Sequence, residues 1–146
     1  MLRDQQISES QAGASATADR PLRIALLSYR SKAHSGGQGI YVRHLSRELA
    51  ALGHHVEVIS GPPYPELDEG PSLTKVPSLD LYREPDPFRV PKLREFRSPI
   101  DVYEFLSVCT GSFPEPLTFS LRARRLLENR PAAERPDIVH DNQTLG

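Results

Sequence analysis

Residues 22–61 read LRIALLSYRSKAHSGGQGIYVRHLSRELAALGHHVEVISG. An apolar run comes first, a glycine-containing loop follows, and an amphipathic segment then leads to a second apolar run. This order predicts strand, loop, helix and strand, the opening unit of an α/β fold with a Rossmann-like parallel sheet flanked by helices. Glycines directly before a helix let the backbone approach a ligand, and the unpaired N–H groups of the first helical turn favour negative charge there. The loop therefore predicts a site for phosphate or another anion.

Apolar spacing and one glycine predict the limits of the first elements. A central parallel strand, covered on both faces, is expected at 22–28, because its apolar residues are nearly continuous. A helix is expected from 37–39 to about 52, ended by Gly53 in a left-handed conformation, and a second strand at 55–60. The apolar stripe of the helix is predicted at Tyr41, Leu45, Leu49 and Leu52. Its wetter side is predicted at Arg43, Ser46, Arg47 and Ala50.

Proline shapes the rest of the chain. Every proline except Pro21 lies beyond Gly61, so long regular elements are not expected between 62 and 98. Later elements are expected as a short strand at 73–76, helices at 99–108 and 116–129, and a strand at 136–140. The first of these helices is expected to have Ile100, Tyr103 and Leu106 or Ser107 along one side. We expect one domain over 21–146, following a disordered tail over 1–20.

Composition excludes several classes of function. The net charge of −1 over 146 residues gives no reason to expect a nucleic-acid partner. The single Cys109 excludes an internal disulfide and a cysteine-based zinc site, and fits a reducing compartment. No apolar run approaches the roughly 20 residues of a membrane-spanning helix, and residues 1–20 lack the apolar core of a secretory signal. A cytoplasmic location is the expectation.

Two loops are predicted to meet at one edge of the sheet. The glycine loop follows the first strand, and a His-Asp-Asn run follows the last one. Ligands of such sheets bind outside the carboxyl ends of the strands, so both loops could face one cleft. The candidate site residues are Gly36, Gly37, Gly39, His140, Asp141 and Asn142. No clustered carboxylates or histidines require a metal, and no cofactor is expected.

Other phosphate-binding sites fit the loop less well. A dinucleotide fingerprint needs G-x-G-x-x-G and an acidic residue at the end of the second strand. Here the glycine spacing differs, and the second strand ends in Ser60-Gly61-Pro62. A P-loop would need Gly-Lys-Ser/Thr after its first glycine, which the sequence lacks.

Four short motifs carry a family resemblance. They are Gly36-Gly37, the run Leu49-Ala50-Ala51-Leu52-Gly53-His54, the strand Val56-Glu57-Val58, and Asp137-Ile138-Val139-His140. Over 21–61 and 136–146, the sequence resembles the amino-terminal half of family 4 glycosyltransferases, which have the two-domain GT-B fold.

The resemblance implies a retaining hexosyltransferase-type enzyme, with a nucleotide-sugar donor and an acceptor as its substrates. In that family the amino-terminal domain shapes the acceptor side, and its Gly-Gly loop approaches the donor diphosphate. The carboxyl-terminal domain grips the nucleotide through a Glu-x7-Glu motif, and a metal is generally not required. A chain of 146 residues has no room for that second domain, so we expect a truncated enzyme with little or no activity alone.

One departure concerns the candidates for catalysis, His140 and Asn142. Many members of the family carry His-x-His after this strand, and Asn142 stands at the place of the second histidine. An amide can hydrogen-bond a sugar hydroxyl, but it cannot exchange a proton near neutral pH.

Two alternatives stay open beside the enzyme. The chain could be a stand-alone, non-catalytic module that binds a small phosphorylated ligand through its glycine loop, or a truncated product without a role of its own. The basic stretches at 89–97 and 122–125 are typical of solvated faces. They could also line up toward anionic headgroups, in weak peripheral contact with a membrane. The oligomeric state stays open.

Overall fold

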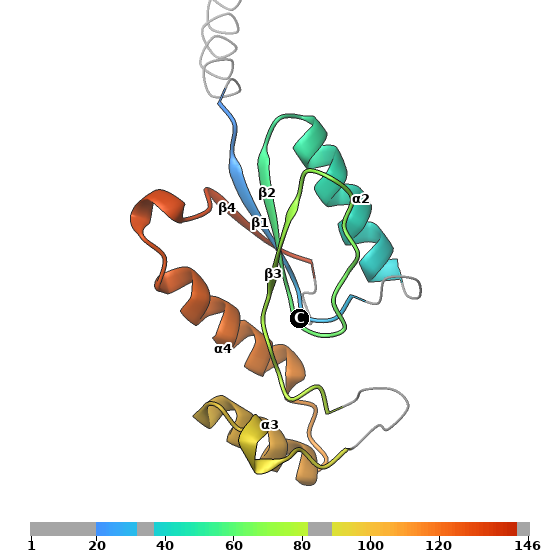
Figure 1. The fold of residues 1–146 in the computed structure, drawn as a ribbon, viewed down its shortest axis with the longest axis vertical. Coiled ribbons are helices and arrows are strands. Elements are labelled where there is room, and N and C mark those ends of the chain that lie inside the picture. Colours follow the sequence, from blue (N-terminus) through green and yellow to red (C-terminus); the bar gives the residue numbers. More distant parts are fainter. Residues whose placement is uncertain (1–19, 32–36, 82–88, 143–146) are drawn as a thin grey trace, which may run out of the picture.

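The computed structural model describes residues 20–31, 37–81 and 89–142 (Figure 1). The expected tail at 1–20 lies outside them except for its last residue. The strands are β1 (Arg23–Ser28), β2 (His55–Ser60), β3 (Ser72–Lys75) and β4 (Ile138–Asp141). The helices are α2 (Gly37–Ala51), α3 (Pro99–Cys109) and α4 (Glu115–Glu128), with 3-10 turns at Leu93–Glu95 and Ala132–Glu134.

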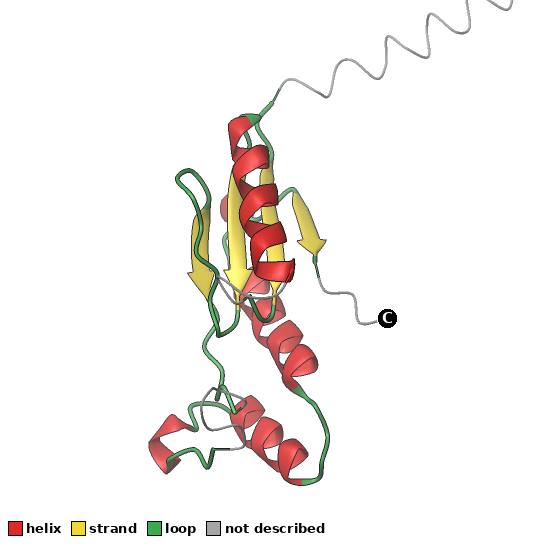
Figure 2. Cartoon of the chain, turned by 90° about the vertical axis from the view of Figure 1, so that its right-hand side faces the viewer, coloured by secondary structure: helices red, strands yellow, loops and turns green. Residues whose placement is uncertain are grey.

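The strands form one parallel sheet in the order β3-β2-β1-β4. Helix α2 covers one face of the sheet, α4 lies on the other, and α3 lies beyond the strands' carboxyl ends (Figures 1 and 2). The predicted Rossmann-like α/β class is thus confirmed. The strand limits agree with the predictions to within two residues, and the helix limits do so to within one.

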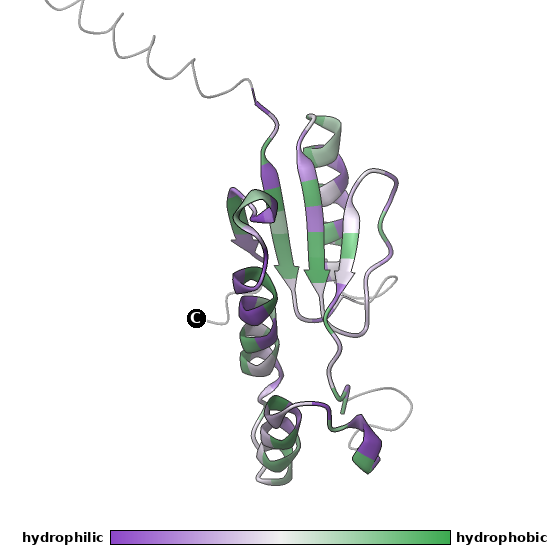
Figure 3. Ribbon diagram, turned by 60° about the vertical axis from the view of Figure 1, so that its left-hand side comes forward, coloured by the Kyte–Doolittle hydropathy of each residue, from purple (hydrophilic) through white to green (hydrophobic). Residues whose placement is uncertain are grey.

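The two faces of the sheet explain why β1 is apolar almost throughout. One face buries Ile24 and Leu26 against Val42 of α2, and the other buries Ala25 against Phe119 and Ala123 of α4. The two central strands are green over most of their length in Figure 3, as expected when successive side chains enter cores on opposite sides. The prediction of a central strand covered on both faces is confirmed.

The predicted apolar stripe of α2 is wrong at both ends. Tyr41 is 50% exposed and Leu52 is 73% exposed, whereas Val42 and Ser46, the latter predicted on the wetter side, are fully buried. The Ser46 hydroxyl donates to the Arg43 carbonyl at 3.0 Å, so burial leaves its polar group satisfied. A small side chain with an internal hydrogen bond lets the helix lie close to the sheet, which apolar spacing alone does not reveal.

The predicted apolar side of α3 is wrong in a similar way. Ile100 is buried and Ser107, the alternative to Leu106, is half-buried, but Tyr103 and Leu106 are 49% and 58% exposed. The buried face carries Asp101 and Glu104 instead, because Arg122 of α4 forms an ion pair with each of these carboxylates. Burying carboxylates is tolerable only when such a partner compensates their lost hydration.

Candidate functional site at the carboxyl edge of the sheet

The end of β4 and the start of α2 lie at the same edge of the sheet (Figures 1 and 2). Leu27 of β1 is in register with Asp141, and the Asn142 N–H donates to the Leu27 carbonyl at 3.2 Å. The parallel sheet therefore brings His140, Asp141 and Asn142 beside the strand that leads into the glycine loop. Gly36 lies outside the described residues, so its place at this edge stays a prediction.

Gly37 opens α2, and nothing in the packing of the described residues requires a glycine there. A Cβ atom at this position would meet no described atom within 4 Å, and Gly37 is not among the glycines with positive φ. The first turn of α2 also has no acidic side chain that would offset the partial positive charge of the helix N-terminus. Among the described residues, nothing fills the space at Gly37, and the helix N-terminus has the polarity that an approaching anion needs.

Gly39 lies in the first turn of α2. It is buried, together with Val42 and Ser46, on the side of the helix that faces the sheet. This burial does not test the predicted contact with a ligand, because the free N–H groups of a first helical turn point along the helix axis and not toward one side.

The three residues at the end of β4 and directly after it differ in exposure. His140 and Asp141 are exposed on this strand, and Asn142 is half-buried. The Asn142 side-chain nitrogen is itself buried and has no hydrogen-bond partner among the described residues. An unpaired buried donor costs roughly 1–3 kcal/mol, and a ligand oxygen at the sheet edge could satisfy it.

Sequence reasoning missed the contacts that fix the start of the glycine loop. Ser28 and Ser31 are both buried, and their hydroxyls are joined by a hydrogen bond of 2.5 Å. The Ser31 N–H donates to the Pro63 carbonyl at 3.0 Å. A serine at the end of an apolar strand and another three residues later are a weak signal for such an anchor, and only the buried contacts reveal it.

An ion pair ties the same segment to α4. Arg30 contacts Glu115 at 3.2 Å, and the Glu115 side chain is 9% exposed. Burial raises the pKa of Glu115 to about 7, and the charges of Glu104 and Asp80 add to the rise, while Arg30 opposes it. The first helical turn of α4 thus carries a carboxyl group that changes charge near neutral pH.

This raised pKa predicts a stability that falls as the pH rises. Between pH 4.5, the ordinary value, and about 7, Glu115 holds its proton in the folded chain but loses it in the unfolded chain. The free energy of unfolding should therefore drop by about 1 to 3 kcal/mol across this window, and Glu115→Gln should abolish most of the drop. Denaturant titrations at pH 5 and pH 8 measure it.

Glu128→Gln is the matched control, because Glu128 lies at the other end of α4 with a side chain 58% exposed. It should leave the pH dependence unchanged. Carboxyl groups with lowered pKa, such as Glu57 and Asp101, titrate below this window. An unchanged drop in Glu115→Gln would contradict the assignment.

Comparison with known proteins identifies the family of this domain. Residues 36–146 match the model of the glycosyl transferase 4-like domain. The chain belongs to the family 4 glycosyltransferases. It is also 67% identical, over 126 residues, to the MMP alpha-(1->4)-mannosyltransferase of Mycolicibacterium hassiacum, a match that covers 86% of this chain and 30% of that relative. The resemblance inferred from the short motifs is thereby confirmed.

The family assignment agrees with the architecture, since this parallel sheet with its flanking helices is consistent with an amino-terminal half of a GT-B fold. Among the described residues, none of the helices is both long and apolar enough to cross a membrane. In the same part of the chain, no group of three or more His, Cys, Asp or Glu residues could hold a metal ion.

Proposed function

We propose that this glycosyltransferase chain supplies the acceptor-facing half of a retaining mannosyltransferase, which uses a nucleotide-sugar donor. The observation that carries the proposal is the first turn of α2 at Gly37, which no described residue covers and which lies at the same edge of the sheet as Asn142. The N–H groups of this turn would approach the donor diphosphate. Mannose as the transferred sugar is supported by the similarity to the mannosyltransferase of Mycolicibacterium hassiacum.

Asn142 has a binding role in this proposal. Its buried side-chain nitrogen would donate to a hydroxyl or phosphate oxygen of the substrate, and its amide would not exchange protons. The exposed His140 and Asp141 are the other polar side chains proposed to contact the substrate. We propose that transfer requires the second domain as well, because both walls of a cleft are needed to align donor and acceptor.

A chimera tests this proposal. The chain replaces the segment that it matches in the relative from Mycolicibacterium hassiacum, and mannose transfer is measured with nucleotide-mannose donors. Because the two sequences are 67% identical over the matched segment, we expect kcat/KM within about tenfold of the unmodified relative, or 1.4 kcal/mol in the transition-state free energy. The anomeric configuration of the product, read by NMR, tests retention.

The isolated chain is the negative control, and we expect no measurable transfer from it. Turnover by the isolated chain would contradict the need for a second domain. A folded but inactive chimera would contradict the transferase role. If calorimetry then detected binding of sugar phosphates to the isolated chain, the result would favour the non-catalytic module.

A further inference from the structure

A pocket of about 430 Å³ lies beyond the end of β3, between the segment that follows this strand and helices α3 and α4. Its apolar walls include Val76, Leu79 and Ile100, which are buried, and the half-buried Leu126. None of the candidate residues at the carboxyl edge lines it. Leu126 and its neighbours belong to α4, on the opposite face of the sheet from α2, so the pocket is separate from Gly37.

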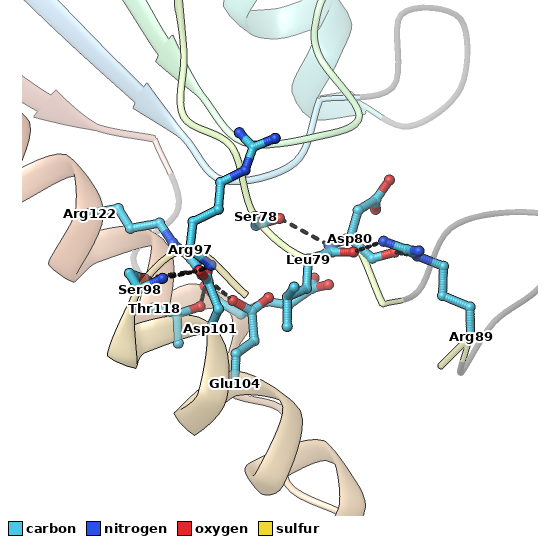
Figure 4. Close-up of polar contacts among 11 residues, drawn as sticks. Ser78, Leu79, Asp80, Arg89, Arg97, Ser98, Asp101, Glu104, Thr118 and Arg122 are labelled. Atoms are coloured by element: carbon cyan, nitrogen blue, oxygen red, sulfur yellow. Dashed lines mark hydrogen bonds and ion pairs between the residues drawn. The ribbon is translucent and has the colours of Figure 1, made fainter. Parts of the chain in front are cut away.

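The rim of the pocket is positively charged. Lys75, Arg97 and Arg125 line it, and all three are exposed. The guanidinium groups of Arg97 and Arg125 have no hydrogen bond or ion pair within the described part of the chain. In Figure 4 the Arg97 side chain extends away from the neighbouring polar cluster. Lys75 lies 5.0 Å from the centre of the Tyr64 ring, and no ion pair with a carboxylate is seen for it among the described residues.

The acidic residues of the pocket do not cancel this charge. Its two carboxylates are Glu95 and Asp101, and each has an arginine partner of its own. Glu95 contacts Arg89 at 2.6 Å, and Asp101 contacts Arg122 at 2.6 Å. An excess of positive charge therefore remains at the rim, above an apolar floor.

The arginines of the two basic stretches thus fall into two groups. Arg89, Arg122 and Arg124 are held in ion pairs, whereas Arg97 and Arg125 converge on the pocket from the two stretches. Neither stretch is simply a solvated face. The concave shape also separates this site from a flat membrane-binding surface, because the volume is that of a small-molecule pocket.

We infer that this pocket binds a small soluble organic anion, with a phosphate or carboxylate group at the rim and a short apolar body against the floor. The rim cations supply charge-assisted hydrogen bonds, and the floor supplies the burial of apolar surface. The inference is independent of sugar transfer, since it rests on other residues and on direct binding.

Calorimetry with the 146-residue chain tests the inference. The probes are octyl phosphate and octanoate, both below their micelle-forming concentrations. Inorganic phosphate lacks the apolar body, and octyl glucoside lacks the charge. At least one octyl anion should bind ten times more tightly than both controls, because charge and apolar surface each contribute more than about 1.4 kcal/mol. A preference for phosphate over carboxylate, or the reverse, identifies the head group.

Two variants locate the binding in the pocket. Arg97→Gln and Arg125→Gln should each weaken the octyl anion by about tenfold. Arg94→Gln is the matched control, because Arg94 is exposed on the same stretch as Arg97 and does not line the pocket; it should change the affinity less than twofold. All three residues are exposed, so thermal unfolding of the variants should match that of the parent chain.

Several outcomes would overturn the inference. Equal affinity for the octyl anions and for either control probe would show that the pocket does not select an organic anion with an apolar body. An equal effect of Arg94→Gln would show that the charge of the whole surface, not the pocket, attracts the anion. Binding to phosphatidylglycerol vesicles without binding to monomeric octyl phosphate would assign the basic residues to a membrane surface instead.

Discussion

Replacing Arg122 with methionine is expected to lower the free energy of unfolding by about 3 to 5 kcal/mol. The Arg122 side chain is 11% exposed and contacts Asp101 at 2.6 Å and Glu104 at 2.5 Å. The Glu104 side chain is fully buried, so the substitution leaves a carboxylate without its countercharge in the interface between α3 and α4 (Figure 4). Urea titration at pH 7 measures the loss.

Arg124→Met is the matched control, on the same helix. Arg124 is 72% exposed and pairs with Glu128 four residues away, so its loss should cost less than about 0.5 kcal/mol. A loss of similar size in both variants would contradict the buried-charge argument, because methionine would then act through the helix and not through the carboxylates.

A double variant separates the loss of the Arg122 side chain from the cost of leaving the buried Glu104 carboxylate unpaired. One oxygen of Glu104 and one nitrogen of Arg122 have no hydrogen-bond partner among the described residues, so the cluster is incompletely satisfied. Asp101 keeps the backbone N–H groups of Arg97 and Ser98 as partners when Arg122 is absent. Glu104→Met combined with Arg122→Met should therefore recover at least half of the stability that Arg122→Met loses. Two additive losses would contradict this.

The cluster also shows where prediction from the sequence stops. β1, β2 and α2 have limits close to the predicted ones, because their signals are local: two-sided apolar runs and a glycine at the helix end. The buried side of α3 depends on Arg122, which lies 21 residues after Asp101. Apolar periodicity assigns carboxylates to the solvent side, and only the packing of α4 against α3 makes their burial tolerable.

At the candidate site, too, topology could be predicted from the sequence, whereas contacts between distant segments could not. The meeting of His140, Asp141 and Asn142 with the end of β1 follows from parallel topology alone, since all carboxyl ends share one edge. The burial of Gly39 could not be predicted from topology, because residues two positions apart lie on different sides of a helix. The Arg30–Glu115 pair joins residues 85 positions apart, and nothing in the spacing of either segment indicates it.

Gly37→Leu in the chimera is expected to lower kcat/KM for mannose transfer by about 100-fold or more, because the leucine side chain would fill the space proposed for the diphosphate. The fold should tolerate the change. An added Cβ meets no described atom within 4 Å, and leucine is a better helix former than glycine. The free energy of unfolding should therefore stay within about 1 kcal/mol of the parent value or rise.

Gly53→Ala is the control at the other end of α2. Gly53 has a φ of +89°, and its N–H donates to the Ala50 carbonyl at 2.9 Å as the helix ends. Alanine should cost about 1 to 2 kcal/mol in stability, because a side chain strains this left-handed conformation, and it should leave kcat/KM nearly unchanged. The two glycines then separate function from folding. If Gly37→Leu transferred mannose as fast as the parent chimera, Gly37 would be a simple connector, and the diphosphate would have to bind elsewhere.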